Sequence, residues 1–431
     1  MTTAGSPGTS RRPVDTASSR RTSLSGSTTT PAESTTSSTP SRANSHRCRT
    51  SSSSHRCGCW RRSPRPSEPP PPNSPPPPTE GALARMINTP IRVGLIGLGR
   101  SGWDLHAAGL AELDQYTIVA VADPDPERRA EARSRFTCAT YSEPEALLGD
   151  PQVELVVVAT PSHTHVPLGL AALDARKHVV VEKPMAQTTA DVDTLMAAAD
   201  KADRIVTCFQ NNRFEPIFMA VRKVIDSGRL GELVLIRRSI HRYIRRADWQ
   251  VLRAFGGGEL SNTASHFLDQ LLLLLDDGPI ELLADLRHTV SAGDAEDHVK
   301  LVLKPKTGPL VDLESSCTIA TPQNTWFIAG TTGTLASVAG GLHITWYDPA
   351  TVDEPRLVEG AAPERAYPSP ETITWQEETI QTPPGSGLRT LLYYQHLART
   401  LRDGEDLFVT PKSVRRQIDI IERARQRTGL L

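Results

Sequence analysis

The first part of the chain lacks the residues that build a hydrophobic core. Residues 1–85 contain no isoleucine, phenylalanine, tyrosine or lysine, and residues 69–78 are almost entirely proline. A segment dominated by serine, threonine, arginine and proline cannot bury enough apolar surface to offset the entropy lost on ordering. We therefore predict a disordered tail over residues 1–88, followed by the folded protein. A start codon assigned too far upstream would account for such a tail.

Long apolar runs and ordered cysteine patterns are also missing. The leucine string 271–275 is too short to cross a bilayer, and the paired arginines at 11–12 and 20–21 precede no apolar segment of an export signal. Of the six cysteines, the three beyond the tail, Cys138, Cys208 and Cys317, have the spacing of neither a disulfide framework nor a zinc site. The histidines and cysteines between 46 and 59 fall in a low-complexity run, where a metal cluster is not expected. We expect a cytoplasmic protein with no membrane partner and no metal.

Positive charge is scarce outside the tail. Residues 1–85 hold twelve arginines and four acidic residues, a net charge of +8, which leaves −9 for the rest of a chain whose total is −1. Binding to nucleic acid requires a concentrated basic surface. The folded part is therefore not expected to have nucleic acid as its main partner.

From residue 91 onward, short apolar runs alternate with helix-length amphipathic segments. The runs cover residues 91–96, 117–122, 155–159, 178–181 and 204–209, and the segments between them cover 104–113, 126–136, 166–175 and 190–202. Parallel strands that are buried on both faces and joined by crossover helices have this pattern. We predict a doubly wound, parallel-sheet Rossmann domain over residues 89–210.

The pattern changes after residue 210. A helix over 214–227 precedes a strand over 233–243, and six strand-like stretches follow between 280 and 347. So many strands with so few helices predict an α/β domain with a large, mostly antiparallel sheet. We assign this domain to residues 211–405 and expect it to bind substrate and to join copies of the chain into a dimer or tetramer. A helix in 406–431 is expected to pack back on the Rossmann domain.

A glycine motif lies between the first predicted strand and a helix. The segment Gly97-Leu98-Gly99-Arg100-Ser101-Gly102 fits G-x-G-x-x-G, in which the glycines let backbone amides approach a pyrophosphate at a helix start. Asp123 ends the second strand, where a carboxylate bonds the ribose hydroxyls of a dinucleotide and repels a 2′-phosphate. We expect NAD rather than NADP. Arg128 and Arg129 lie close enough to weaken that preference, although both are typical solvated helix charges.

Three further motifs carry a family resemblance. They are A-T-P-S-H-T-H at 159–165, Glu182-Lys183-Pro184 at the end of a predicted strand, and G-G-G-E-L-S-N-T-A-S-H-F-L-D at 256–269. With the glycine motif, they make the chain from residue 91 to the C-terminus resemble the Gfo/Idh/MocA family of oxidoreductases. The resemblance implies a Rossmann domain that binds a nicotinamide dinucleotide and an enzyme that oxidises a hydroxyl group.

The resemblance also implies residue roles. Lys183 matches a catalytic lysine that contacts the substrate hydroxyl and the nicotinamide ribose, and His266 matches a proton-transfer histidine. The positions implied to form part of the cofactor wall are Glu182, Thr160, Pro161 and His165. Many members have aspartate four residues before the histidine, and this chain has Asn262. Residues four apart share a helix face, so Asn262 can orient His266 without offering charge, and either His266 or a neutral Lys183 is the base.

Candidate substrate ligands lie in and before the second domain. Arg213 is at the predicted domain junction, and a basic run spans residues 237–249. Such a run is usually a solvated strand edge or an oligomer contact, but it closely precedes the segment with His266. Arg245 or Arg246 could therefore bind a sugar by bidentate bonds, and Trp249 could stack on it.

The sequence leads to one main hypothesis and two alternatives. The main hypothesis is hydride transfer between a sugar or polyol hydroxyl and NAD. A glycosidase that uses tightly held NAD for transient oxidation is a second possibility, which Asn262 makes conceivable. The third is a non-catalytic dinucleotide-binding protein, and the presence of both Lys183 and His266 argues against it.

Overall fold

The computed structural model describes residues 89–355, 357, 360, 372–385 and 387–429. Contacts divide the chain into residues 1–74 and 75–431, and every described residue belongs to the second unit. The predicted tail and the histidines and cysteines between 46 and 59 lie outside the described residues.

The first sheet has six parallel strands in the order β3-β2-β1-β4-β5-β6. The strands are β1 (Ile91–Ile96), β2 (Tyr116–Ala122), β3 (Ala139–Tyr141), β4 (Leu155–Val158), β5 (His178–Val181) and β6 (Val206–Cys208). Every residue of β4 and β6 is buried, as expected for strands covered on both faces. The order reverses between β1 and β4, and ligands of such sheets bind beyond the carboxyl ends of the strands at that point.

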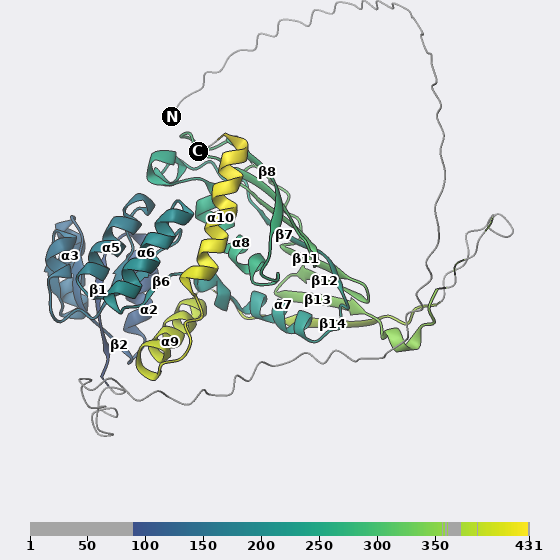
Figure 1. The fold of residues 1–431 in the computed structure, drawn as a ribbon, viewed down its shortest axis with the longest axis horizontal. Coiled ribbons are helices and arrows are strands. Elements are labelled where there is room, and N and C mark those ends of the chain that lie inside the picture. Colours follow the sequence, from purple (N-terminus) through teal and green to yellow (C-terminus); the bar gives the residue numbers. More distant parts are fainter. Residues whose placement is uncertain (1–88, 356, 358–359, 361–371, 386, 430–431) are drawn as a thin grey trace, which may run out of the picture. The chain divides into compact units, whose positions relative to one another are not determined.

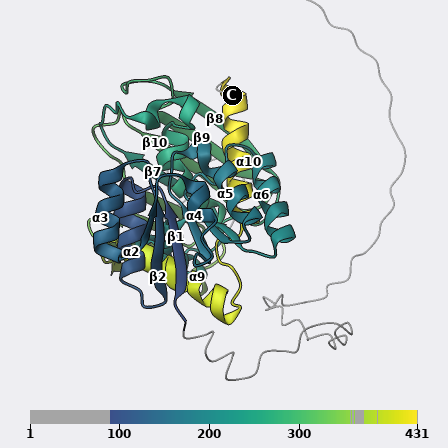
Figure 2. The same cartoon turned by 90° about the vertical axis from the view of Figure 1, so that its left-hand side faces the viewer.

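Helices cover both faces of this sheet. They are π-helix η1 (Ser101–Ala107), α2 (Ala108–Ala111), α3 (Pro126–Phe136), α4 (Pro144–Leu148), α5 (His165–Asp174) and α6 (Thr189–Ala202). Figure 2 shows β1 and β2 between α2 and α3 on one side and α5 and α6 on the other. The start of α3 is fixed by Pro126 and by the Asp125 carboxylate, which accepts hydrogen bonds from the amides of Glu127 and Arg128.

The second sheet has eight strands in the order β14-β13-β12-β11-β7-β10-β9-β8. The strands are β7 (Leu233–His241), β8 (Ile280–Arg287), β9 (His298–Pro305), β10 (Leu310–Ser316), β11 (Trp326–Gly330), β12 (Gly333–Val338), β13 (Gly341–Trp346) and β14 (Gln376–Gln381). Among the described strands of this second sheet, only the pair β7 and β10 is parallel. A parallel sheet followed by a mostly antiparallel one is the predicted fold class, which is confirmed.

Helices lie on one side of the second sheet, as Figure 1 shows. They are α7 (Pro216–Asp226), α8 (Ser265–Leu272) and α10 (Pro411–Thr428), and α8 is preceded by the π-helix η6 (Leu260–Ala264). Short 3-10 helices complete the domain: η3 (Asn211–Phe214), η4 (Trp249–Val251), η5 (Arg253–Phe255) and η7 (Pro349–Thr351). The alternating burial of β9 and β12 agrees with one covered and one open face.

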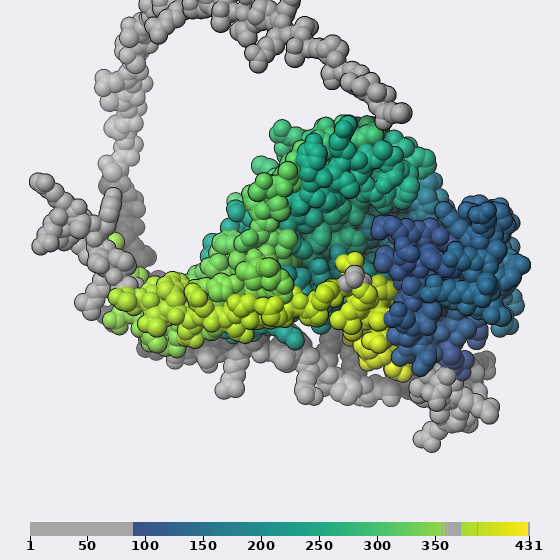
Figure 3. Space-filling model, turned by 180° about the vertical axis from the view of Figure 1, so that it is seen from behind, coloured from purple at the N-terminus to yellow at the C-terminus, as the bar shows by residue number. Residues whose placement is uncertain are grey.

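The last two helices join the domains. Helix α9 (Leu388–Asp403) packs against the start of the Rossmann domain, and Figure 3 shows it in yellow beside the purple residues. Helix α10 reaches both sides: Arg415 pairs with Asp193 of α6, whereas Arg423 donates to the carbonyl of Ile280 in β8. The C-terminal helix therefore contacts both the Rossmann domain and the second domain.

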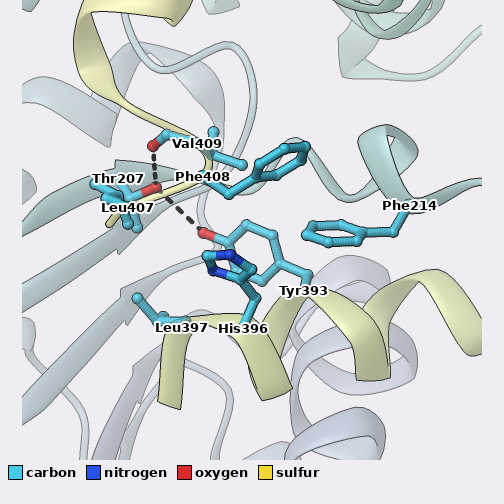
Figure 4. A pocket seen from close by; sticks show the side chains of 8 residues that line it. All are labelled: Thr207, Phe214, Tyr393, His396, Leu397, Leu407, Phe408 and Val409. Carbon is cyan, nitrogen blue, oxygen red and sulfur yellow. Dashed lines mark hydrogen bonds between the residues drawn. The ribbon is translucent and has the colours of Figure 1, made fainter. Parts of the chain in front are cut away.

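The joint between β6, η3 and α9 is tightly filled. It leaves a cavity of only about 10 Å³, lined mainly by apolar and aromatic side chains (Figure 4). Thr207 Oγ1 donates to the carbonyl of Val409 at 2.7 Å, and the ring centroids of Phe214 and Phe408 lie 5.1 Å apart. A space of this size holds one water molecule at most, so this cavity is part of the packing and not a binding site.

Candidate active site

A cavity of about 750 Å³ opens at the carboxyl ends of the first sheet and is also lined by the second domain. The predicted site residues that line it are Gly97, Gly99, Arg100, Ser101, Asp123, Thr160, Pro161, His165, Glu182, Lys183, Trp249, Asn262 and His266. Its size suits a ligand much larger than a single sugar. The structure thus brings most of the predicted cofactor and catalytic residues together in one place.

The glycine loop forms one wall of this cavity. Gly97 has φ of +91°, and a Cβ there would lie 2.7 Å from the carbonyl oxygen of Ala159. A Cβ on Gly102 would meet the Gly97 carbonyl oxygen, so Gly102 serves close packing beneath the cavity and does not line it. Gly99 lines the cavity, and the position of its missing Cβ faces open space. This arrangement fits a pyrophosphate that approaches the backbone at the start of η1.

Asp123 is buried at the end of β2 and also lines the cavity. Its carboxylate accepts hydrogen bonds from the amides of Leu98 at 2.7 Å and Asp125 at 2.9 Å. A carboxylate has about four acceptor sites, so capacity remains for a ribose hydroxyl. Arg128, half-exposed, also lines the cavity, and its Nη1 lies 3.7 Å from Asp123 Oδ2. The site therefore holds an acceptor for ribose together with a cation that could meet a phosphate.

Glu182 fixes the backbone of its neighbour Lys183. Its Oε2 accepts from the Lys183 amide at 2.9 Å, and its Oε1 lies 3.2 Å from Nε2 of the buried His106. His106 Nδ1 lies 2.6 Å from the hydroxyl of Tyr394 on α9, so the ring bridges Glu182 and Tyr394. Burial alone would raise the pKa of Glu182, but His106 and the charge of Lys183 lower that pKa to about 2. Glu182 therefore stays ionised.

Lys183 points across the cavity to the second domain. Its Nζ donates to the backbone carbonyl of Asn262 at 2.7 Å. Burial lowers the pKa of Lys183, as do the charges of Arg100 and Arg246, while Glu182 opposes that shift. The lysine is thus held at the boundary between the domains with a weakened preference for its charged form.

Asn262 and His266 both line the cavity, but no hydrogen bond joins their side chains in the described structure. Asn262 Nδ2 donates instead to the backbone carbonyl of Gln250 at 2.8 Å. Asn262 lies in the π-helix η6 and His266 in the first turn of α8. Both side chains thus reach the same cavity, whereas orientation of the imidazole by the asparagine amide is not seen.

The His266 ring lines this cavity, and one of its nitrogens is enclosed by the protein. Its Nδ1 is buried and has no hydrogen-bond partner. Burial lowers its pKa well below 6.5, and the positive charges of Lys183 and Arg389 lower it further, against the effect of Glu182. The imidazole is therefore neutral at pH 7, and it can accept a proton.

His165 ties two strand ends together. Its Nδ1 lies 2.7 Å from the carbonyl oxygen of Pro184, which follows β5, and its Nε2 lies 2.9 Å from that of Thr160, which follows β4. The ring is almost fully buried, and both nitrogens are used by the protein. His165 thus fixes the loop that carries Lys183, in addition to lining the cavity.

Two predicted substrate ligands lie elsewhere. Arg213 is buried, and its guanidinium donates to both carboxylate oxygens of Asp269, at 2.8 and 2.7 Å, and to the carbonyl of Phe408. Arg245 does not line the cavity, and its Nε is 3.4 Å from the carbonyl of Val290. Arg213 therefore joins elements of the fold, and the basic run contributes Arg246 and Trp249 to the cavity.

The sequence interpretation did not place Asn211 or Arg389 in the site, although both line the cavity. Asn211 is the third residue after the end of β6, so the rule that ligands bind at the carboxyl ends of parallel strands could have found it. Arg389 comes from α9, far along the chain, and no local pattern marks it.

The glycine run before η6 packs too closely for side chains. A Cβ on Gly257 would lie 2.4 Å from the carbonyl oxygen of Gln250, the group that accepts from Asn262. We expect Gly257→Ala to lower the free energy of unfolding by roughly 1–3 kcal/mol, because backbone must move to admit the methyl group. Chemical denaturation measures the loss. Gly278→Ala is the control, since nothing lies within 4 Å of its Cβ position, and equal stability of the two variants would contradict the packing argument.

Two family models match the chain. The oxidoreductase family with an NAD-binding Rossmann fold, GFO_IDH_MocA, matches residues 91–210, and the GFO/IDH/MocA C-terminal domain matches residues 218–336. The chain belongs to the Gfo/Idh/MocA family of oxidoreductases. The resemblance carried by the sequence motifs is thereby confirmed.

Relatives in the Gfo/Idh/MocA family include inositol dehydrogenases. The chain is 28% identical over 360 residues to scyllo-inositol 2-dehydrogenase (NADP(+)) IolW of Bacillus subtilis, covering 79% of this chain and 94% of that one. It is 31% identical over 232 residues to myo-inositol 2-dehydrogenase of Thermotoga maritima, covering 52% and 68%. The structure of the putative oxidoreductase yvaA from Bacillus subtilis superposes with a TM-score of 0.67 at 25% identity, covering 79% and 96%. Within the described residues, no helix of this family member is long and apolar enough to span a membrane.

Proposed function

We propose that this member of the Gfo/Idh/MocA family is an NAD-dependent dehydrogenase that oxidises a CH–OH group of a sugar or polyol. The observation that carries the proposal is the common cavity of the glycine loop, Lys183 and His266. The residues that would hold the dinucleotide are the loop from Gly97 to Ser101, Asp123 and the residues after β4 and β5. When bound, the nicotinamide takes up the hydride.

The residues of the chain manage the proton of the hydroxyl. His266 supplies a neutral imidazole that lines the cavity, which suits a general base. Lys183 supplies an N–H donor that stabilises negative charge on the substrate oxygen, and its Nζ is already fixed by the Asn262 carbonyl. In this assignment His266 takes the proton and Lys183 orients the oxygen from which it comes.

Oxidation of a sugar or polyol is supported by the relatives, which are named as inositol dehydrogenases. The lining of Asn211, Asn262, Gln250 and Trp249 offers amides and an indole, which suit hydroxyl groups and the apolar face of a sugar ring. Reduction of NAD in the presence of single sugars, inositols and sugar acids tests the proposal. Absence of reduction with all of them would count against it.

Asp123 is proposed to favour NAD over NADP, although IolW is named for NADP. We expect Asp123→Ala to weaken the binding of NAD by roughly tenfold or more and the binding of NADP by less. The lost carboxylate both bonds the ribose and repels a 2′-phosphate. Titration of each cofactor, followed by protein fluorescence, gives the two dissociation constants.

The same carboxylate supports the glycine loop through the Leu98 amide, so a second variant is needed. Asp123→Asn keeps the shape and one acceptor oxygen, which can still bond the Leu98 amide. It removes the charge and turns the second oxygen, which accepts from the Asp125 amide, into an NH2 donor. We expect this variant to keep the conformation of the glycine loop and to reduce the difference between the dissociation constants of NAD and NADP. Equal weakening of both cofactors in both variants would remove Asp123 from the ribose site.

We also propose that copies of the chain associate through the open face of the second sheet. Cross-strand ion pairs cover its centre: Lys300 Nζ lies 2.6 Å from Asp312 and 2.8 Å from Glu314, and Arg237 lies 3.3 Å from Asp312. Leu283 and Leu310 are exposed beside them. Apolar side chains next to charges that are already paired suit contact with a second copy.

A further inference from the structure

One charged side chain in the active-site cavity has no role in the proposed reaction. Arg389 lies in the first turn of α9 and lines the cavity with Lys183 and His266. Within the described part of the chain its guanidinium makes no hydrogen bond and no ion pair, and its Nε is buried without a partner. Arg389 is partly exposed, but arginine stays charged and carries five N–H donors, so the guanidinium has hydrogen-bonding capacity that a ligand in the cavity can fill.

The other cations that line the cavity are accounted for. Arg246 donates to Asp248 at 2.7 Å, Arg128 lies 3.7 Å from Asp123, and Lys183 donates to the Asn262 carbonyl. Arg100 belongs to the glycine loop, where a dinucleotide places its pyrophosphate. Arg389 therefore adds a positive charge that neither the protein nor the expected phosphates balance.

The position of Arg389 is fixed by its neighbours. The next residue, Thr390, is buried, and its hydroxyl accepts from Asn211 Nδ2 at 3.4 Å. The Thr390 side chain also closes on Gly109, where an added Cβ would lie 2.5 Å from it. The positive charge of Arg389 lowers the pKa of His266, so the guanidinium acts on the reactive part of the cavity. A helix start held by these contacts thus places an unpaired guanidinium in the cavity that the proposed base also lines.

We propose that Arg389 binds an anionic substituent of the substrate, so that the preferred substrate is an acidic sugar or polyol and not a neutral one. A carboxylate and a phosphate ester share the chemistry that a guanidinium recognises through paired N–H bonds. Such a bond also fixes the substrate in one orientation, which selects the hydroxyl that faces His266 and Lys183. The inference rests on the proposed oxidation of a hydroxyl group and names the class of compound that carries it.

Calorimetric titration of the NAD-loaded full chain tests the inference separately from turnover. The probes are matched sets: glucose with glucuronate, gluconate and glucose 6-phosphate, and galactose with galacturonate. We expect at least one acidic member to bind about tenfold to a hundredfold more tightly than its neutral partner. Arg389→Gln should abolish that preference without changing the dissociation constant of NAD. Arg389→Lys keeps the positive charge but loses the paired N–H donors of the guanidinium. It should retain part of the preference for acidic probes.

Each outcome bears on the inference. Equal binding of neutral and acidic probes to the unaltered protein overturns it, and so does an unchanged preference in folded Arg389→Gln. Weaker NAD binding with no change in probe preference would assign Arg389 to the cofactor instead. Whether NADH forms with the bound probe is recorded in the same samples. Acid-selective binding that depends on Arg389 but yields no NADH would uphold this inference while contradicting the proposed dehydrogenase.

Discussion

Replacing His266 with alanine is expected to lower kcat by about 10²- to 10⁴-fold, the usual contribution of a positioned general base. The imidazole is neutral and lines the cavity, so in the proposed reaction its removal leaves the substrate proton without its acceptor. The affinity for NAD should be retained. Steady-state rates with the substrate found by the NAD-reduction screen, together with a cofactor titration, measure both quantities.

The pH dependence gives His266 a second readout. Because burial and the neighbouring cations lower its pKa below 6.5, the ring is neutral above that pKa, and kcat should fall only as the pH drops through it. The acid limb of the kcat profile is thus expected below pH 6.5 and should vanish in His266→Ala. His343→Ala on the second sheet is a control that should leave the profile unchanged. Near-normal turnover of His266→Ala would make Lys183 or another group the base.

Lys183→Ala is expected to damage kcat by a similar factor, roughly 10²- to 10³-fold, because a donor to the developing alkoxide is lost. Its Nζ already bridges to Asn262, so the variant also removes a contact between the domains. Lys183→Met, which retains most of the side-chain volume, separates the loss of the donor from the loss of packing. Turnover and melting temperature are measured for both variants.

The double variant distinguishes a joint role from two separate ones. If His266 and Lys183 act on the same hydroxyl, His266→Ala with Lys183→Met should be little slower than either single variant, since each alone already disables the unit. A reduction in kcat equal to the product of the two single-variant reductions would show that the residues act independently. Rates of Lys183→Met close to those of the unaltered protein would exclude Lys183 from the reaction.

The Rossmann domain could be predicted well because its signals are local. Buried parallel strands read as continuous apolar runs, and β1 and β5 begin and end at the residues that the sequence predicted. Strand β3 was missed because it has only three residues and is partly exposed. Strand β14 was missed because it is polar and mostly exposed. It shows neither a continuous apolar run nor an alternation of apolar and polar residues.

The sequence could indicate the candidate site residues that lie in motifs. It could not indicate those that only tertiary contacts bring to the cavity. Lys183 and His266 stand in motifs and lie in the cavity as expected. Arg213 resembled a ligand by its place at the junction, but its bonds to Asp269 are made by a helix that only the fold brings near. Arg389 reaches the cavity from a helix more than a hundred residues after His266, and side-chain contacts across such separations have no sequence period.

The most direct test of the account is the stoichiometry of NAD reduction. Purified full-length protein is incubated with NAD and each sugar, polyol or sugar acid, and NADH and the oxidised product are measured in the same samples. The account predicts that one or more substrates give NADH and a carbonyl product in equal amounts over many turnovers, and that His266→Ala greatly slows both. Product formation without net NADH, as in glycoside cleavage with retained NAD, would contradict it. So would binding of NAD with no product from any substrate.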